Sequence, residues 1–525
     1  MNKENETYRR VETFFGKMLG RHEIIHIETD FTLEDTAGKG ILYYPESFKK
    51  VIQTAAVKRM ARIFQLGTKI YTYPNVVHTR IEHSKGTYYR TLELLQILYE
   101  NENIKKMIHE KGYEKYVLAT LARALLHDIG HGPFSHTIET VCDLPKGFHE
   151  EIGKRLIKEN PELREALDGI YPGLSKLIEE VKEKNFLGLN RIFEGQADLD
   201  RGDFGPRDSF FANANFKENS RVASELFSSI TITKVKDGNG DTMIIPVFAA
   251  NQIGNLDLFF TNRFNNYKNI YYNPKCSSYD YVFKAFAERL LQCEEYYKLK
   301  EFLSNNTGKK PEEIDLEEYI QFNDVEFLKR IMEVAEKTKD PILRKLAMMS
   351  LPTKSKAKDI YYGLMISEEQ VDEDGYRAYT NESDEEFIRR LEQLPDSDTE
   401  YEQNCLTLNN NSSQNINEVI QRIKLSLGID AEDLEKLGIF SWNYRLSLYK
   451  NKLGEETYIY GENGEIYEYS AHPGRRVELQ QEDVPGFCIL IPILEANGYE
   501  KEKIDEVRKI IEENNKQFQT DEPCQ

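Results

Sequence analysis

The chain has 525 residues, of which 40% are hydrophobic and 30% charged, and its formal net charge is -20. This length exceeds one typical domain, and this composition excludes a wholly disordered protein. The negative charge repels extended polyanions, so duplex nucleic acid is not expected as a main partner. A small anionic nucleotide is compatible, provided that basic side chains or a metal ion meet its phosphates locally.

No segment is long and apolar enough to predict a membrane span or a signal peptide, and the longest apolar run, 487–494, contains Pro492. The six cysteines are scattered singly without a CxxC pair, which predicts reduced thiols and not disulfides. We therefore expect a cytoplasmic protein with no membrane partner.

The apolar pattern predicts a mainly α-helical protein with small β-hairpins. Residues 1–40 are expected to form an N-terminal segment and residues 41–300 a helical core. Residues 301–525 are expected to form a mostly helical C-terminal region that serves regulation or oligomer contacts.

Three elements can be predicted individually. Apolar residues recur at helical spacing from Tyr116 to Leu125 and Gly130 follows, so a helix is expected to end between them. Runs of β-branched and aromatic residues flank glycine-containing turns at 230–245 and near 457–470. Both patterns predict β-hairpins.

Histidine is concentrated in one part of the chain. Seven of the ten histidines lie at positions 78, 83, 109, 127, 131, 136 and 149. The densest motifs are residues 80–84 (RIEHS) and 127–136 (HDIGHGPFSH), and an acidic motif, 198–203 (DLDRGD), follows downstream. Imidazole and carboxylate groups together suit a divalent metal ion.

The spacing within these motifs predicts a metal site for hydrolysis. His127 and Asp128 at a helix end can offer two donors to one ion, and His83 with a distant Asp would complete four ligands. Such a set leaves positions open for water and a phosphate oxygen. Arg80 lies three residues before His83, on one helical face, so a cation for a polyphosphate is expected beside the metal. For His78 a structural role is favoured.

Four motifs resemble the HD-domain superfamily, and within it the deoxynucleoside triphosphate (dNTP) triphosphohydrolase branch. They are residues 65–67 (QLG), 80–84, 127–136 and 198–204 (DLDRGDF), of which the third is the most specific. The resemblance covers roughly residues 40–290 and implies an HD-domain helical core. Enzymes of this branch split a dNTP into deoxynucleoside and intact triphosphate, so water attacks the α-phosphorus.

The resemblance implies a single divalent metal bound by His83, His127, Asp128 and Asp200, with Asp198 in a supporting role. This ligand set leaves Mn, Fe, Zn, Ni and Mg open. Additional Mg bound to the triphosphate is also compatible. The metal and its neighbours are expected to gather at the α-phosphate.

The resemblance also implies the catalytic residues. His149 matches the family's acid, which protonates the leaving oxygen, and Glu139 stands where its partner carboxylate is usually Asp. A carboxylate on one imidazole nitrogen fixes the tautomer and keeps the ring protonated longer. His131 and His136 match positions that line the phosphates.

Further matched positions imply contacts with the nucleotide. Glutamine and leucine of the QLG motif should meet the sugar, three arginines should meet phosphate, and an aspartate should meet the 3′ hydroxyl. Two adjacent tyrosines both fit the position that gates the 2′ carbon. These substrate-binding residues are Gln65, Leu66, Arg80, Arg201, Asp208, Arg263, Tyr271 and Tyr272.

Three features depart from the family pattern. Phe204 replaces a tyrosine often found there, and 205–206 (GP) is expected to interrupt the helix, which puts strict deoxyribose selection in doubt. No N-terminal SAM domain is expected. Gln53, Lys58 and Ala61 stand where the eukaryotic member holds its guanine nucleotide activator, so that site is not carried over.

Hydrolysis of dNTPs is the leading hypothesis. One alternative is an HD phosphohydrolase acting on a signalling nucleotide, a monophosphate or a single-stranded 3′ end. Another, from a different class, is a non-catalytic nucleotide sensor. By resemblance alone, a homo-oligomer, either dimer or tetramer, is expected.

Overall fold

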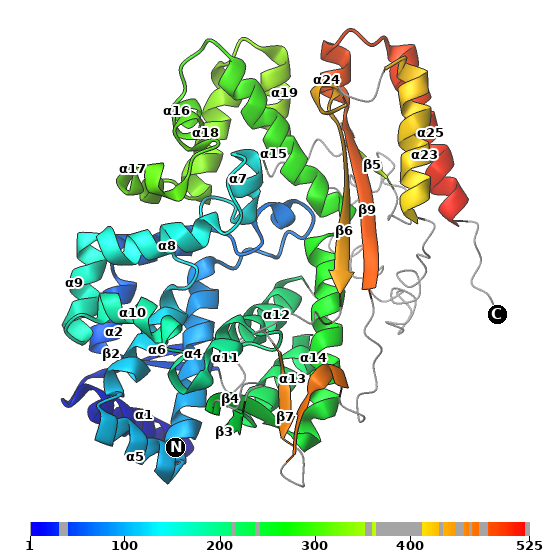
Figure 1. Ribbon diagram of the computed structural model, residues 1–525. Helices are drawn as coiled ribbons and strands as arrows, with labels where there is room; N and C mark the ends of the chain where they lie inside the picture. Colours follow the sequence, from blue (N-terminus) through cyan, green and yellow to red (C-terminus); the bar gives the residue numbers. More distant parts are fainter. Residues whose placement is uncertain are drawn as a thin grey trace, which may run out of the picture. The chain divides into compact units, whose positions relative to one another are not determined.

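The structure is a computed structural model, which describes residues 2–30, 40–212, 216–236, 242–351, 360–363, 412–429, 434–447, 449, 456–460, 465–471 and 481–519. It is mainly helical with small sheets, as predicted (Figure 1). Contacts divide the chain into two compact units. The first is Met1–Tyr272, Val282–Pro352 and Leu446–Glu482, and the second is Asn273–Tyr281, Thr353–Arg445 and Asp483–Gln525. The predicted boundary near residue 300 lies inside the first unit.

The first unit holds most of the helices. They are α1 (Asn2–Leu19), α2 (Glu46–Ile52), α3 (Ala55–Lys58), α4 (Arg80–Glu100), α5 (Glu102–Lys111), α6 (Glu114–Leu126), α7 (His136–Val141), α8 (Phe148–Glu159), α9 (Pro161–Ile170), α10 (Leu174–Glu183), α11 (Asn190–Glu194), α12 (Leu199–Phe211), α13 (Phe216–Ser228), α14 (Ile253–Asn266), α16 (Lys298–Asn306), α17 (Leu316–Gln321), α18 (Asp324–Lys337) and α19 (Pro341–Met349). Helix α15 (Pro274–Gln292) belongs partly to each unit.

Helix α4 is central to the first unit and carries the RIEHS motif at its start. Of its 21 residues, 15 are buried, and it contacts α6, α12 and α13. Glu82 accepts a hydrogen bond from the backbone N–H of Thr79 at 2.6 Å, as in a capping box. This cap fixes where α4 begins, and it places Arg80 and His83 in the first turn, where α6 and α12 approach.

Helix α6 ends at Leu126, as predicted, and the 127–135 loop follows. Within this loop Phe134 and Ser135 have φ angles of 55° and 56°. Non-glycine residues seldom adopt positive φ, and such backbone persists only where neighbours hold it. The hydroxyl of Ser135 donates to the carbonyl oxygen of Phe64 at 2.8 Å.

Helix α12 runs without a break through Pro206, so the prediction that 205–206 interrupts it is wrong. Proline inside a helix removes one backbone hydrogen bond and crowds the preceding turn. Here α12 packs against α4, α13 and α14, and the Asn266 amide donates to the carbonyl oxygen of Gly205 at 3.0 Å. These tertiary contacts outweigh the local cost.

Both predicted hairpins are confirmed as antiparallel pairs, and their turns lie outside the described residues. They are β3 (Thr231–Lys236) with β4 (Thr242–Ala249), and β7 (Tyr458–Tyr460) with β8 (Ile466–Glu468). The sequence did not predict that β4 pairs in parallel with β7, which joins the hairpins into one sheet, β3-β4-β7-β8. An unpredicted hairpin near the N-terminus joins β1 (Ile25–Thr29) to β2 (Ile41–Pro45).

The second unit has its own small sheet and helices. Its strands are β5 (Ile360–Gly363), β9 (Gln481–Leu490) and β6 (Ile439–Ser447), in the order β5-β9-β6, and its helices include α23 (Ser412–Leu427), α24 (Ile491–Ala496) and α25 (Lys501–Gln519). Apolar residues of the helices and strands, among them Ile423, Ile489 and Val507, form one core. The regulatory or oligomeric role expected of this region stays a prediction.

No helix in the described part of the chain combines the length and the apolar character that crossing a bilayer requires. Cys142, Cys276, Cys293 and Cys488 are free thiols. The other two cysteines lie outside the described residues.

Candidate active site

The four predicted metal ligands come together from three helices. His83 lies on α4, His127 and Asp128 directly follow α6, and Asp200 lies on α12. The Nε2 atom of His83 is 3.1 Å from Nε2 of His127 and 2.9 Å from Oδ1 of Asp200. The carboxylate of Asp128 lies 3.5 Å from Nε2 of His127 and 3.6 Å from Nε2 of His83. His83, His127 and Asp128 thereby form a group that could hold a metal ion.

The donor atoms of this group fit a divalent cation. The Nδ1 atoms of His83 and His127 face oxygens that only accept, Asp203 Oδ2 at 2.8 Å and the carbonyl oxygen of Ala124 at 2.9 Å. Each Nδ1 therefore carries a proton, and each Nε2 faces the shared space with Asp200. Positive charge is needed there, either a proton on Nε2 or a cation that the Nε2 lone pairs bind in its place. Two ligand atoms that each lie about 2.1 Å from the same ion, with an angle of about 90° between them, are about 3 Å from each other.

The electrostatics of the group favour a cation as well. Burial acts to lower the pKa of His83, but hydrogen bonds with Asp200 and Asp203 raise this pKa to about 10. Burial acts to raise the pKa of Asp200, but hydrogen bonds with His127 and His83 hold it well below its usual value. The carboxylates thus attract positive charge strongly, and a divalent ion would supply that charge.

An outer carboxylate, which sequence reasoning missed, orients His83. Besides the bond to His83, Asp203 accepts two bonds from Arg207, both at 2.9 Å, and Arg207 also donates to Asp30 at 2.9 Å. A Cβ atom on Gly86 would overlap the side chains of Asp203 and Arg207, so a larger residue there would displace this pair. Partners of this kind fix the ring of a metal-binding histidine. The available signal was helical spacing, since Asp203 lies three residues after the predicted metal aspartate.

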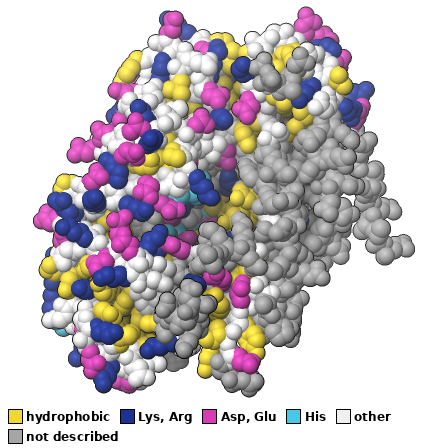
Figure 2. Space-filling view, viewed as in Figure 1, with side chains coloured by type: hydrophobic (Ala, Val, Ile, Leu, Met, Phe, Trp, Pro, Cys, Tyr) yellow, Lys and Arg dark blue, Asp and Glu magenta, His cyan; other side chains and the backbone are white. Residues whose placement is uncertain are grey.

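The four predicted catalytic residues form a second cluster beside the first. Glu139 lies between two imidazoles, with Oε1 2.6 Å from His149 Nδ1 and Oε2 3.2 Å from His136 Nδ1. The ring of His149 stacks on His131, with centroids 4.0 Å apart and an interplanar angle of 13°. His131 Nε2 lies 3.5 Å from Asp128 Oδ1, so Asp128 joins the two clusters. In Figure 2 a patch of histidine side chains lies in a recess near the middle of the face, beside basic side chains.

Folding lowers the pKa of Glu139 and of His131. Burial acts to raise the pKa of Glu139, but hydrogen bonds with His136 and His149 hold it below its usual value. Burial, followed by the charge of Arg80, lowers the pKa of His131 well below its usual value. At neutral pH the cluster therefore contains an ionised carboxylate and at least one neutral imidazole.

Replacing Glu139 by Gln should destabilise the protein more at neutral than at acidic pH. A carboxylate whose pKa is lowered by folding stabilises the protein above its unfolded pKa of about 4.3, and this contribution is lost as the pH falls toward the folded value. We expect a loss of about 1–2 kcal/mol at pH 7 that shrinks toward about pH 3. Urea unfolding at both pH values checks this, with exposed Glu150→Gln as the matched control. An equal loss at both pH values would contradict the linkage.

Arg80 is buried and lies beside the candidate metal group, where it contacts Asp128. Its guanidinium donates to Asp128 Oδ2 at 2.5 Å, to Ser135 Oγ at 3.0 Å and to the carbonyl oxygen of Gln65 at 3.2 Å. The side-chain oxygen of Gln65 is buried and has no hydrogen-bond partner among the described residues. A ligand hydroxyl would satisfy such an atom. Leu66 follows at the start of a 3₁₀ turn.

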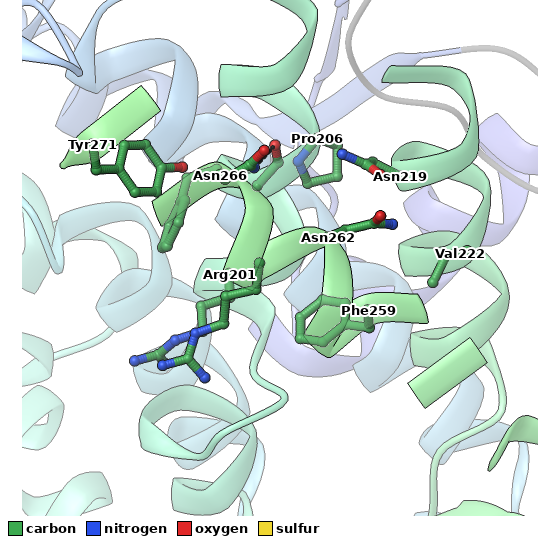
Figure 3. A pocket seen from close by; sticks show the side chains of 11 residues that line it. Arg201, Pro206, Asn219, Val222, Phe259, Asn262, Asn266 and Tyr271 are labelled. Carbon is green, nitrogen blue, oxygen red and sulfur yellow. Dashed lines mark hydrogen bonds between the residues drawn. The ribbon is translucent and has the colours of Figure 1, made fainter. Parts of the chain in front are cut away.

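Arg201, Arg263 and Tyr271 line one small cavity (Figure 3). In Figure 3 Tyr271 and Arg201 lie on one side of this cavity and Asn219 of α13 lies on the other. Asn262 and Asn266 of α14 lie between them. Phe204 also lines it, and its ring centroid lies 6.0 Å from that of His83 and 6.2 Å from that of Tyr271. Phe204 thus connects the cavity to the metal group.

Both arginines of the cavity also contact protein groups. Arg201 donates to the carboxylate of Asp198 and, at 3.0 Å, to the carbonyl oxygen of Gly195. Arg263 donates to the side-chain oxygen of Gln196 at 3.2 Å. Asp198 caps the start of α12 by accepting from the backbone N–H of Arg201 at 2.8 Å.

The sequence left both Tyr271 and Tyr272 possible beside the 2′ carbon, and the two tyrosines differ in their contact with Asp208. Its Oδ2 accepts a hydrogen bond from the Tyr271 hydroxyl at 2.7 Å, and its Oδ1 lies 2.7 Å from Nε2 of His78. Tyr272 instead packs its ring on Tyr267, with centroids 5.5 Å apart, and does not line the cavity. His78, which the sequence favoured as structural, therefore contacts a predicted substrate residue.

Residues far from the motifs hold the 127–135 loop. Asp324 accepts from the backbone N–H of Phe134 at 2.6 Å and from that of Phe64 at 2.8 Å. Arg59 donates to the carbonyl oxygens of residues 129 and 131, at 2.8 and 2.6 Å, and the Tyr319 hydroxyl donates to that of residue 130 at 3.1 Å. No sequence motif indicated these contacts.

Replacing Asp324 by Ala should lower the free energy of unfolding by about 2 kcal/mol, because two buried N–H groups lose their acceptor. The matched control is Asp315→Ala, at the exposed start of α17, where only an N-cap is lost at a cost of about 1 kcal/mol. Urea denaturation compares the two. A smaller effect at Asp324 than at Asp315 would mean that the loop does not depend on this carboxylate.

Comparison with known proteins identifies the central part of the chain. Residues 80–191 match the family model described as HD domain. The uncharacterized protein YwfO of Bacillus subtilis (strain 168) is 26% identical over 250 residues, which cover 46% of this chain and 52% of YwfO. The deoxynucleoside triphosphate triphosphohydrolase SAMHD1 of Homo sapiens is 33% identical over 115 residues, which cover 22% of this chain and 17% of SAMHD1. The chain thus spans about half of YwfO and a smaller part of SAMHD1.

The fold has a close counterpart among solved structures. The crystal structure of a phosphohydrolase (BT4208) from Bacteroides thetaiotaomicron VPI-5482 matches with a TM-score of 0.59 and 21% identity, over 89% of this chain and 99% of that chain. At this identity the likeness concerns the fold alone. Residues 80–191 of this protein therefore match an HD domain, and this is the part of the chain that contributes His83, His127 and Asp128.

Proposed function

We propose that this protein hydrolyses deoxynucleoside triphosphates to deoxynucleoside and inorganic triphosphate, by attack of water at the α-phosphorus. The observation that carries the proposal is the continuity of the site. Asp128 joins the metal group to the His149–Glu139 pair, and Phe204 joins the metal group to the cavity that Tyr271 lines. The resemblance to SAMHD1, whose name states this activity, supports the same substrate class.

The residues can be given roles in this reaction. A divalent ion held by His83, His127, Asp128 and Asp200 would neutralise a phosphate oxygen and lower the pKa of water. Glu139 occupies Nδ1 of His149, so the imidazole is oriented to transfer a proton through its other nitrogen.

The bond that breaks joins the α-phosphorus to the 5′ oxygen of the nucleoside. That oxygen leaves with an electron pair and must gain a proton, which His149 is suited to donate. Arg80, beside the metal group, and Arg201 and Arg263, at the cavity, can meet the charge of the triphosphate. The side-chain oxygens of Asp208 accept hydrogen bonds, so they suit a sugar hydroxyl better than a phosphate oxygen.

The test is an analysis of products. The purified protein, stripped of metal and supplied with Mn or Mg, is incubated with each of the four dNTPs and the four matching NTPs, and products are separated by ion exchange. We expect deoxynucleoside and triphosphate, both absent with a His127→Ala, Asp128→Ala double variant. Release of monophosphate or of terminal phosphate would show that another bond is cleaved. No turnover of any of the eight would favour an HD phosphohydrolase for another nucleotide, or a nucleotide sensor.

A further inference from the structure

A buried chain of three polar side chains lies at the end of the site away from the metal group. It consists of His78, in the segment before α4, Asp208, on α12, and Tyr271, at the end of the π-helical turn Tyr267–Tyr271. The side chains of His78 and Asp208 are 0% and 2% exposed. Each oxygen of Asp208 has one of these partners, and both distances are 2.7 Å. The orientation of the carboxylate is thus set from both sides.

The ring of His78 is held in one position. It stacks on Phe211, with ring centroids 4.3 Å apart and an interplanar angle of 11°. Its Nδ1 atom is buried and has no hydrogen-bond partner in the described part of the chain. A carboxylate oxygen only accepts, so Nε2 is the nitrogen that carries the proton. Among the described residues the bond to Asp208 is therefore the polar interaction of the His78 side chain, and a phenylalanine would pack there without leaving a buried nitrogen unpaired.

Asp208 accepts the hydrogen bond of the Tyr271 hydroxyl, which also hydrogen-bonds with Asn266. Burial, followed by the charge of Asp208, raises the pKa of Tyr271 well above its usual value, so the phenol keeps its proton and donates it to Asp208. The Tyr271 side chain also lines the small cavity (Figure 3). If the carboxylate of Asp208 rotated, the hydroxyl of Tyr271 would lose its acceptor, and this wall of the cavity could move.

A nucleotide would meet this end of the site with its sugar. Asp208 and Tyr271 offer a carboxylate and a phenol hydroxyl, which can bind sugar hydroxyls, whereas the groups that can meet phosphates are Arg201 and Arg263, which also line the cavity. A small cavity with a fixed tyrosine wall excludes an added hydroxyl, whereas a mobile wall admits it. Discrimination between 2′-deoxy and 2′-hydroxy sugars therefore depends on how firmly Tyr271 is held.

We propose that His78 is a positioning residue that holds Asp208, and through it Tyr271, and thereby sets the preference of this site for 2′-deoxynucleotides over 2′-hydroxynucleotides. The proposal rests on the proposed function, because it assigns the Asp208 end of the site to the sugar. It also makes a structural claim that can be tested without turnover: the Asp208–Tyr271 arrangement depends on His78.

The experiment compares two substitutions of His78. His78→Phe keeps a ring against Phe211 and removes the donor, whereas His78→Gln places an amide donor near the position of Nε2. The ratio of kcat/KM for a dNTP to that for the NTP of the same base is measured in the wild type and both variants, with bound metal as a control. We expect this ratio to fall about tenfold in His78→Phe, equivalent to about 1.4 kcal/mol, and to stay within about threefold in His78→Gln. Bound metal should not change.

An unchanged ratio in His78→Phe, or an equal fall for both sugars, would overturn the proposal, since a merely structural residue would affect both alike. If His78→Phe does not fold, His78→Asn takes its place, because the shorter amide does not reach Asp208. A wild type without dNTP turnover would refute the proposed function, and the crystal structures of the wild type and His78→Phe then decide the structural claim. If the hydrogen bond between Asp208 and Tyr271 is unchanged in His78→Phe, the structural claim is refuted. If these two side chains are displaced, the structural claim is supported.

Discussion

Replacing His83 by Ala should abolish tight metal binding and lower kcat/KM by about 10³-fold or more. The Nε2 atom of His83 lies 3.1 Å from Nε2 of His127 and 2.9 Å from Oδ1 of Asp200. His83 also connects the metal group to Asp203, which orients the ring. Alanine removes the donor and leaves the Asp203–Arg207 pair without its imidazole partner, so neither the ion nor its geometry would be retained.

The measurement is bound metal per chain by elemental analysis, together with steady-state kinetics on the substrate that the product analysis identifies. The matched control is His109→Ala, in the same stretch of sequence, because His109 bonds to Tyr99 and Glu114 at the surface and not to the metal group. The control should keep its metal and its activity within about twofold. If His83→Ala kept both, the metal centre would have to lie elsewhere.

Replacing Gly130 by Ala should lower the free energy of unfolding by about 3 kcal/mol or more. A Cβ atom on Gly130 would overlap the carbonyl oxygen of His149 and the backbone nitrogen of Gly153, which belong to α8. Backbone atoms within a helix cannot turn aside as a flexible side chain can. To make room, α8 would have to move away from the 127–135 loop and would carry His149 with it.

The control for this prediction is Gly169→Ala on α9, where a Cβ atom would meet nothing within 4 Å. There alanine should be neutral or stabilise the protein by up to about 1 kcal/mol, because glycine is unfavourable inside a helix. Urea unfolding compares both variants with the wild type. Similar effects of the two substitutions would show that α8 does not lie as close to the loop as described.

Several contacts from different helices hold the 127–135 loop in place. Arg80 contacts it from α4, Gly130 lets α8 approach it, and Asp324 accepts from its backbone beside a residue with positive φ. The loop carries His127 and Asp128 of the candidate metal group and His131 of the second cluster. A loop held from several sides keeps those ligands in a fixed geometry, which a metal site requires.

The sequence by itself determined the features that depend on near neighbours. The helical spacing of apolar residues, followed by Gly130, predicted that α6 ends close to His127. Both hairpins followed from β-rich runs around short turns. The candidate metal group could be proposed from the sequence because the motifs that carry His83, His127 and Asp128 combine imidazole with carboxylate, which suits a divalent ion.

Only the tertiary structure decided the rest, because contacts between distant residues leave no local pattern. His78 and Asp208 are 130 residues apart, and Phe134 and Asp324 are 190 apart. The parallel pairing of β4 with β7 joins two hairpins that look independent in the sequence. Pro206 stays helical because packing outweighs its local cost. The sequence therefore determined which residues could do the chemistry, and the folded chain decided which others hold them in place.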